Sequence, residues 1–189
     1  VDKMQGVYIP FWLYSGNCEG SITAEGINTR TWTSGNYRYT EKKYYSVYRN
    51  GTLDFKAVPV DASSKTDDDA MDSIEPFDYS EMTAFNPGYL SGYLAERYDE
   101  DKDKCLPRAK ERIENTTRDE LRNTCNYNSV NVQSYEKHTE IKDVKYAMLP
   151  TWLLYTTYQD KPYFFAMNGQ TGKFIGNLPI SKGKLVAYS

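Results

Sequence analysis

The stretch Ile9–Tyr14 reads IPFWLY, and a close copy, LPTWLLY, recurs at Leu149–Tyr155. Both copies are almost wholly apolar or aromatic, which is typical of a strand buried on both faces. A lysine and an Asn-Gly pair follow each copy with the same seven-residue spacing, at 43 and 50–51 and again at 161 and 168–169. Repetition on this scale predicts a duplicated β unit.

The texture of the chain around the two copies predicts its architecture. Alternating and β-branched segments fill about 7–60 and 128–180, and helical patterns lie between them at about 66–124. Because most connections between the strands have hairpin character, we expect an α+β fold with a mostly antiparallel sheet. We treat residues 1–189 as one domain, divided into a first β unit at 7–60, a helical insert at 61–126 and a second β unit at 127–181.

Turn residues divide the two β units into expected strands. Ser15-Gly16-Asn17 predicts a break after the first strand, and Thr33–Asn36 predicts a turn. Asn50-Gly51 predicts a hairpin, since this pair accepts positive φ at both central positions of the turn. A hairpin tip is also expected around His138. Residues 161–167 are expected to pair with 173–179 across a turn at 168–172.

The insert contains three helical patterns. Asp67–Asp69 gives an acidic first turn to a short helix that ends near Ile74. Residues 87–98 place Tyr89, Leu90, Tyr93 and Leu94 on one face at helical spacing, so this segment is expected to pack on the sheet. The strongest helix is expected from Leu106 to Thr124, with Pro107 in its first turn.

The charge balance argues against long-range attraction to polyanions. The chain has a net charge of −3 and a pI of about 5.3. Its main run of basic residues, between 102 and 118, is interleaved with acids, which is the pattern of a solvated helix face. We therefore do not expect this chain to bind nucleic acid. No apolar run approaches the roughly 20 residues that would span a bilayer.

The cysteines predict no metal centre within the chain. Cys18, Cys105 and Cys125 are far apart, no CxxC pair occurs, and His138 is the only histidine. A structural zinc site needs about four such ligands in paired spacings. We expect three free thiols in a reducing compartment and no cofactor in this chain.

Aromatic residues are the candidate binding residues. Trp12 and Trp152 occupy equivalent positions of the repeat, either as paired core residues or as an aromatic platform for a ligand. The chain has 18 tyrosines. In the segment 37–48 the strand period places Tyr37, Tyr39 and Tyr45 on one side and Tyr44 and Tyr48 on the other. Such a strand suits a core on one face and a partner surface on the other.

Six stretches carry a family resemblance, and they are Tyr8–Leu13, Tyr44–Val47, Pro59–Asp61, Ile74–Tyr79, Tyr93–Asp99 and Phe165–Lys173. Together they make nearly the whole chain similar to a family of uncharacterised bacterial proteins, mostly from Firmicutes. In that family the similar region follows an amino-terminal zinc ribbon of the transcription-factor-IIB type and precedes carboxy-terminal membrane helices. The resemblance implies that this chain is a middle domain and that the zinc and the membrane anchor lie outside it. The domain would then lie on the cytoplasmic face of the membrane.

The leading interpretation is a non-enzymatic interaction domain of a membrane-associated bacterial protein, which binds a protein or peptide through an aromatic β surface. One alternative is a nucleic-acid-associated module that works with a zinc ribbon outside the chain. Another is a hydrolase with an unrecognised site. A pocket with converging carboxylates, for example from Asp67–Asp69 and Glu75, would favour the hydrolase.

Overall fold

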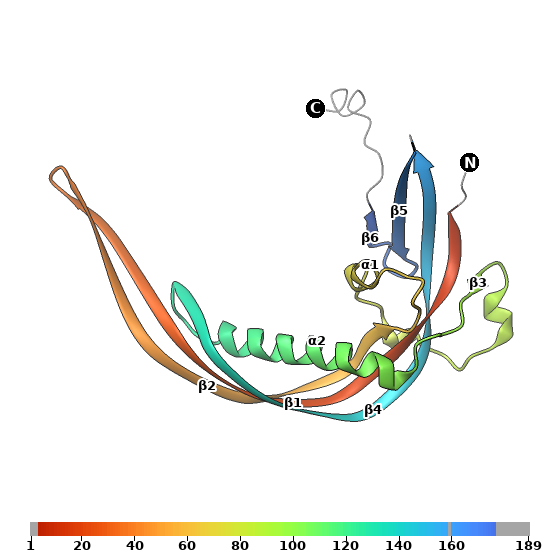
Figure 1. Ribbon diagram of the computed structural model, residues 1–189, viewed down its shortest axis with the longest axis horizontal. Helices are drawn as coiled ribbons and strands as arrows, with labels where there is room; N and C mark the ends of the chain where they lie inside the picture. Colours follow the sequence, from red (N-terminus) through yellow and green to blue (C-terminus); the bar gives the residue numbers. More distant parts are fainter. Residues whose placement is uncertain (1–3, 159, 177–189) are drawn as a thin grey trace. The chain divides into compact units, whose positions relative to one another are not determined.

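The computed structural model describes residues 4–158 and 160–176 (Figure 1). The longest strands are β1 (Gln5–Ser34), β2 (Tyr37–Asp61) and β4 (Ser129–Tyr158), and shorter ones are β3 (Leu94–Ala95), β5 (Lys161–Asn168) and β6 (Phe174–Gly176). The helices are α1 (Asp68–Ser73), α2 (Lys102–Asn123) and two 3-10 turns, η1 (Tyr79–Glu81) and η2 (Pro87–Leu90). The six-stranded sheet has the order β2-β1-β4-β5-β6, with β3 paired to β1. This mostly antiparallel sheet with one main helix confirms the predicted α+β class.

The chain forms two compact units, and β1 and β4 each run through both. Unit 1 contains residues 1–13, 59–105 and 145–189, and unit 2 contains residues 14–58 and 106–144. Within unit 2 the partners on β1 and β4 follow opposite chain directions, since Cys18 contacts Thr139 and Thr23 contacts Ser134. Within unit 1, β4 pairs antiparallel with β5 from Thr151↔Asn168 to Tyr158↔Lys161.

Unit 2 is built on a strict alternation along β1. Every even-numbered residue from Tyr14 to Gly26 is buried, and the intervening residues are more exposed. The buried face is covered by α2, where Ile22, Ala24 and Val47 form a core cluster with Leu121 and Cys125. Small residues on this face let the helix approach closely. A methyl group on Gly20 would lie 2.9 Å from Thr117 Cγ2.

The predicted break at Ser15-Gly16-Asn17 is wrong, because β1 continues through it. A methyl group on Gly16 would lie 2.0 Å from the carbonyl oxygen of Glu140. Gly16 is thus needed for the close approach of two backbones, which is a common role of glycine inside a strand. The local turn signal is overridden by pairing within the sheet.

Two further predicted turns are also strands. β2 runs through Asn50-Gly51, and β4 runs through His138, which is exposed. Isolated Asn-Gly permits a hairpin but does not force one when neighbouring strands extend the pairing. Because the Asn50-Gly51 hairpin does not form, the hairpin part of the proposed repeat has no counterpart in the first copy.

The other two predicted turns are confirmed. The β1–β2 hairpin turns at Gly35, which has φ +61°. The Asn168–Gly172 turn brings β5 and β6 together, with Ala166 opposite Ile175. The predicted continuation of this hairpin at 177–179 lies outside the described residues. Trp12 and Trp152 both lie on strands, as expected.

The main helix begins earlier than the sequence pattern predicted. α2 starts at Lys102, because Asp101 Oδ1 accepts hydrogen bonds from the N–H groups of Asp103 and Lys104 at 3.0 and 2.8 Å. This is the usual chemistry of a helix N-cap. Pro107 consequently lies inside the helix instead of in its first turn. The short helix α1 is confirmed, and Asp67 caps it by accepting from Ala70 N at 2.8 Å.

The predicted helix at 87–98 is wrong. The segment forms η2, a bend at Gly92 with φ +87° and the short strand β3. Two glycines and a proline weaken the helix, and backbone pairing of Leu94 and Ala95 with Val7 and Tyr8 replaces it. Tyr89 and Leu94 are about half exposed, so they do not pack on the sheet as expected.

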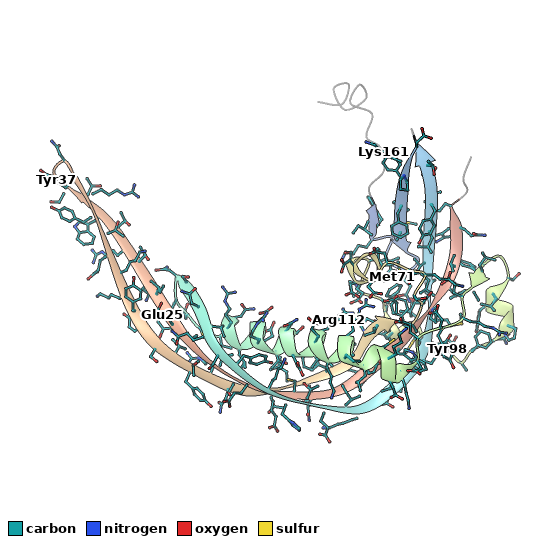
Figure 2. All side chains as sticks on the ribbon, in the orientation of Figure 1. Glu25, Tyr37, Met71, Tyr98, Arg112 and Lys161 are labelled. Carbon is teal, nitrogen blue, oxygen red and sulfur yellow. The ribbon has the colours of Figure 1, made fainter. Side chains whose placement is uncertain are left out.

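Unit 1 has its own apolar core. Phe11 of β1 contacts the ring of Phe77 at 5.9 Å, and Met71 and Ile74 of the α1 region are fully buried. Buried Asn168 ties the turn after β5 to this region, since its Nδ2 donates to the carbonyls of Ile74 and Pro76 at 3.0 Å each. Met71 is labelled among the packed side chains of unit 1 in Figure 2.

Candidate functional site

The predicted binding residues fall into two groups. Trp12 and Trp152 belong to unit 1, whereas Tyr37, Tyr39 and Tyr45 belong to unit 2. The surroundings of each group are therefore those of its own unit.

Trp12 packs against residues 93–100, a segment of unit 1. Its Nε1 donates to the carbonyl of Glu100 at 2.9 Å. Its ring lies 5.5 Å from that of Tyr98 and 5.2 Å from that of Tyr146, both in edge-on geometry. Burial, followed by the neighbouring Tyr98, raises the pKa of the Tyr146 phenol. The indole is half-buried in this group.

Trp152 occupies a second aromatic group under the same segment. Its ring contacts Tyr93 at 5.7 Å, and Tyr93 contacts Tyr8 at 5.1 Å. A methyl group on Gly6 would lie only 2.6 Å from the Tyr93 ring, so Gly6 makes room for it. Both tryptophans thus pack against residues 93–100. A role for them as a ligand platform stays a prediction.

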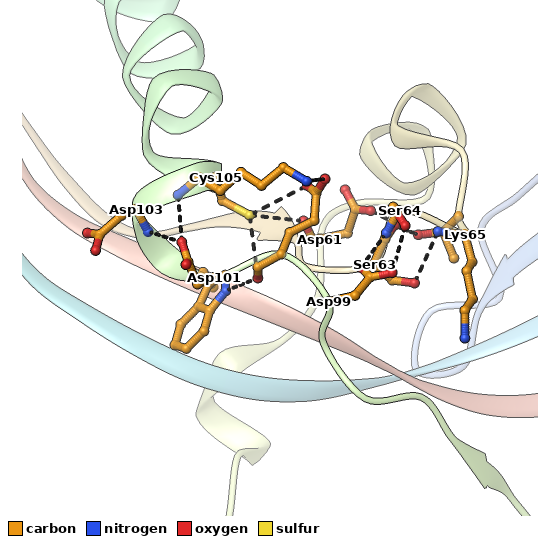
Figure 3. Close-up of polar contacts among 12 residues, drawn as sticks. Asp61, Ser63, Ser64, Lys65, Asp99, Asp101, Asp103 and Cys105 are labelled. Atoms are coloured by element: carbon orange, nitrogen blue, oxygen red, sulfur yellow. Dashed lines mark hydrogen bonds and ion pairs between the residues drawn. The ribbon is translucent and has the colours of Figure 1, made fainter.

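Polar contacts to Glu96 and Asp99 also hold the segment 93–100 (Figure 3). Asp99 accepts from Ser64 N at 2.8 Å and from Ser64 Oγ at 2.6 Å, and Ser63 Oγ donates to Glu96 at 2.9 Å. These serine contacts, the side chain first, lower the pKa of Asp99. Cys105 is buried with its thiol 3.7 Å from the carbonyl of Asp61.

The carboxylates of unit 1 are grouped differently from the hydrolase expectation. Asp67, Asp68 and Asp69 line an open depression with Ser64, Thr66 and Glu100. Glu75 lies elsewhere, with its carbonyl accepting from Lys173 Nζ at 2.6 Å. In this depression Ser64 donates to a carboxylate, and His138 belongs to unit 2.

Unit 2 presents an exposed aromatic surface. The β1–β2 hairpin from residue 29 to residue 46, called the arm from here on, has every residue exposed. Its rings include Tyr37 at 71% exposure and Trp32 at 42%. Figure 2 shows Tyr37 at the tip of this hairpin. Exposed aromatic groups of this extent commonly mark interaction sites.

The arm is ordered by its own side-chain pairs. Trp32 and Tyr39 lie opposite each other and stack, with centroids 5.6 Å apart and planes 15° from parallel. The guanidinium of Arg30 lies over the Trp32 ring at 5.7 Å. On the other face Thr31 Oγ1 and Thr40 Oγ1 are 3.4 Å apart. Cross-strand aromatic pairs of this kind stabilise a hairpin by about 0.2–1 kcal/mol each.

Four of the five aromatic residues of the arm, Trp32, Tyr37, Tyr39 and Tyr45, share one face by strand alternation, and Tyr44 lies on the other face. Tyr45 contacts Tyr127 at 5.1 Å, and Val47, two residues further, enters the core below α2. Because side chains alternate along a strand, Tyr39 and Tyr37 continue this face to the hairpin tip. The buried face of unit 2 therefore extends into an uncovered aromatic face.

The arm is also basic. It contains Arg30, Arg38, Lys42 and Lys43 against a single acid, Glu41, so its net charge is +3 although the whole chain has −3. Sequence reasoning missed Trp32 and Arg30 as surface residues and looked for basic patches only on the helix. The signal was the aromatic-basic alternation on both sides of the turn at Gly35.

The described residues were also compared with the requirements of a metal site and of a membrane span. Cys18, Cys105 and Cys125 are buried free thiols. Among residues 4–158 and 160–176 no three His, Cys, Asp or Glu side chains are grouped to hold a metal ion. Within that same part of the chain, none of the helices combines the length and the apolar character needed to cross a bilayer.

Comparison with known proteins gives one informative match. The chain is 38% identical, over all 189 of its residues, to the uncharacterized protein YdjG of Bacillus subtilis (strain 168). It spans 55% of the length of that protein, so it is similar to one part of a longer relative of unknown function. No family model matches the chain, and no solved structure matches it.

Proposed function

We propose that this chain is a non-enzymatic interaction domain that binds a partner protein or peptide through the arm. The observation that carries the proposal is a continuous hairpin, residues 29–46, in which every residue is exposed and four of the five aromatic residues share one face. A protein partner that covers these rings would remove about 150–250 Å² of surface for each fully buried one.

Charge indicates the kind of partner. Four basic side chains against one acid on the arm favour a partner with an acidic surface. A second copy of the arm would bring the same positive charge into contact with this one, which disfavours self-pairing. The expected partner is therefore a protein or peptide whose contact surface combines apolar and acidic groups.

The test is site-specific crosslinking in cells of the source organism. A photo-reactive amino acid replaces Tyr37 in the arm or, as a matched control, the exposed Asp54 of β2 outside the arm. We expect a defined protein adduct from position 37 and none from position 54. The adduct should disappear in Lys42→Glu/Lys43→Glu and persist in Lys56→Glu. Equal adducts from both positions, or none from position 37, would refute the proposal.

The setting of the domain is also proposed. We place it in a membrane-associated bacterial protein, on the cytoplasmic face, with a zinc ribbon and membrane helices outside this chain. Support comes from the family resemblance and from a relative in which the matching region is 55% of the length. Fractionation of the full-length protein, with zinc measured by mass spectrometry, tests this setting. Recovery without membrane or without zinc would remove the corresponding part.

A nucleic-acid-associated module remains the second candidate because the arm combines stacked rings with cations. Proteins that bind single strands use this combination, at about 1–3 kcal/mol for each stacked base. Fluorescence anisotropy with labelled single and double strands at about 150 mM salt tests it. We expect no binding by the chain alone. Sub-micromolar affinity that is lost in Trp32→Ala and Lys42→Glu would place this function first.

A further inference from the structure

A second candidate binding site lies in unit 2, away from the arm. A groove of about 630 Å³ runs between the start of β4 and the C-terminal half of α2. Its lining consists of six consecutive strand residues, 130–135, and of Arg118, Asp119 and Arg122 on the helix. Figure 1 shows the start of β4 near the C-terminal end of α2.

One wall of this groove is the edge of a strand. In the sheet order β4 has β1 on one side and β5 on the other, and β5 pairs only with residues 151–158. Among the described residues, the part of β4 at 129–135 therefore has a strand on one side only. The Nε of Arg122 donates to the carbonyl of Val130 at 3.3 Å, so a strand that pairs with this carbonyl must displace the Arg122 contact. An edge of this kind can accept an added strand.

The opposite wall carries two arginines at matched spacing. Arg118 and Arg122 are four residues apart on α2, which is about 6 Å along a helix axis. Alternate residues of an extended peptide are about 6.6–6.8 Å apart and point to the same side. Two acidic residues separated by one position would thus meet the two guanidiniums, each of which can bind a carboxylate through paired N–H donors.

One acid lies among these groups. Asp119 Oδ1 accepts from Nε and Nη2 of Arg118, both at 3.1 Å. Both side chains are exposed to solvent, so this ion pair is worth little and can be exchanged for a peptide carboxylate. Asp119 is then the residue that would oppose an acidic ligand.

We propose that this groove binds an extended acidic peptide of the pattern acid-x-acid, which adds as a strand to the edge of β4 and pairs its carboxylates with Arg118 and Arg122. A nucleic acid could use the arginines but not the strand edge. A second copy of this edge would bring its own arginines to the same place. The acidic peptide is the occupant that uses both walls.

The probe is a fluorescein-labelled peptide, GTVEVEVTGS, titrated into the 189-residue chain. Two control peptides carry lysines, GTVKVKVTGS, or place the glutamates on opposite faces, GTVEEVVTGS. A fourth peptide has N-methyl groups on the backbone amides of both its glutamates and its three valines, so that the amides on either edge of the extended peptide are blocked. We expect saturable binding of the first peptide alone.

Protein variants separate the two walls. Arg118→Gln and Arg122→Gln should each weaken binding about tenfold. Lys110→Gln, on the same helix but outside the groove, should leave it unchanged. Asp119→Asn should strengthen binding by removing a like charge. Because Arg122 also contacts Val130, thermal unfolding of each variant is measured alongside, and Arg118→Gln alone carries the conclusion if Arg122→Gln fails to fold.

Several outcomes would overturn the proposal. They are the absence of saturable binding at millimolar peptide, equal binding of the N-methylated peptide, and indifference to Arg118→Gln. Displacement of the peptide by a labelled single-stranded oligonucleotide with the same arginine dependence would instead assign the groove to nucleic acid. Substitutions in the arm should not affect this site.

Discussion

At the scale of single residues, hydrogen bonds decide how the segment 93–100 is held. Asp99 receives two donors from Ser64, and Trp12 donates to the carbonyl of Glu100. Neither contact follows from a local sequence pattern, because their partners are 35 and 88 positions away. Such contacts act on the ionisation of the carboxylate as well as on the fold.

Ser64→Ala should raise the pKa of Asp99 towards its ordinary value. The hydrogen bond from the Ser64 hydroxyl is the largest cause of the lowered pKa, and the backbone donor remains. Since the folded pKa is lowered, this contact stabilises the protein above the ordinary pKa of aspartate, about 3.9, and is lost as pH falls through the folded pKa. Carboxyl carbon NMR measures the shift. Asp78, whose pKa is lowered by Ser80, is the internal control and should not move.

At the scale of elements, the alternation of small residues along β1 fixes the distance between the sheet and α2. Gly20 meets Thr117 and Leu121 of the helix, whereas Gly51 of β2 has only an ordinary contact, 3.5 Å from Leu121 Cδ2. The two glycines therefore differ in what an added methyl group would meet.

Gly20→Ala should destabilise the protein by about 1–3 kcal/mol, because the methyl group forces the helix away from the strand. Gly51→Ala should change the free energy of unfolding by less than about 0.5 kcal/mol. Urea unfolding at equal protein concentration compares them. A large loss of stability in Gly51→Ala would instead indicate that Asn50-Gly51 forms the hairpin turn expected from the sequence, because alanine is strained in such a turn.

Leu94 tests whether the segment 87–98 forms η2 and β3 and not the helix predicted from the sequence. With 53% of its surface exposed, Leu94→Ala should cost about 0.5 kcal/mol or less, and not the several kcal/mol expected of a helix packed on the sheet. Ile113 of α2, 1% exposed, is the matched buried position, and Ile113→Ala should cost about 2–5 kcal/mol. Equal costs at the two positions would contradict the assignment of β3.

At the scale of the whole molecule, β1 and β4 pass through both units, so neither unit is a continuous piece of chain. The thiols are divided in the same way. Cys105 belongs to unit 1, and Cys18 and Cys125 belong to unit 2, each buried among contacts of its own. Cys18 lies 3.4 Å from Thr139 Oγ1, and the Cys125 thiol lies 3.6 Å from the carbonyl of Leu121.

We therefore expect the purified 189-residue chain to carry no stoichiometric zinc. Elemental analysis after dialysis without chelator checks this expectation. Cys105→Ser and Cys125→Ser are measured as well, so that any zinc found can be assigned. Zinc that persists through dialysis and is lost in either variant would show that a cysteine site forms.

The sequence by itself determined the features that depend on local chemistry. The apolar Ile9–Tyr14 and Leu149–Tyr155 lie on strands, the acidic start of α1 and the long amphipathic α2 are helical, and Gly35 and Asn168–Gly172 turn. It also placed Tyr37, Tyr39 and Tyr45 on one face, since strand alternation is a local property.

Only the tertiary structure decided where a local turn or helix pattern is replaced by strand pairing. Gly16, Asn50-Gly51 and His138 continue their strands, because pairing with neighbouring strands outweighs the local preference for a turn. Residues 87–98 have a helical pattern but form no α-helix, and Leu94 and Ala95 pair with β1 instead. The arm is exposed for the same kind of reason, since it continues the sheet beyond the residues that α2 covers. Long-range pairing and packing, which no local window contains, made these choices.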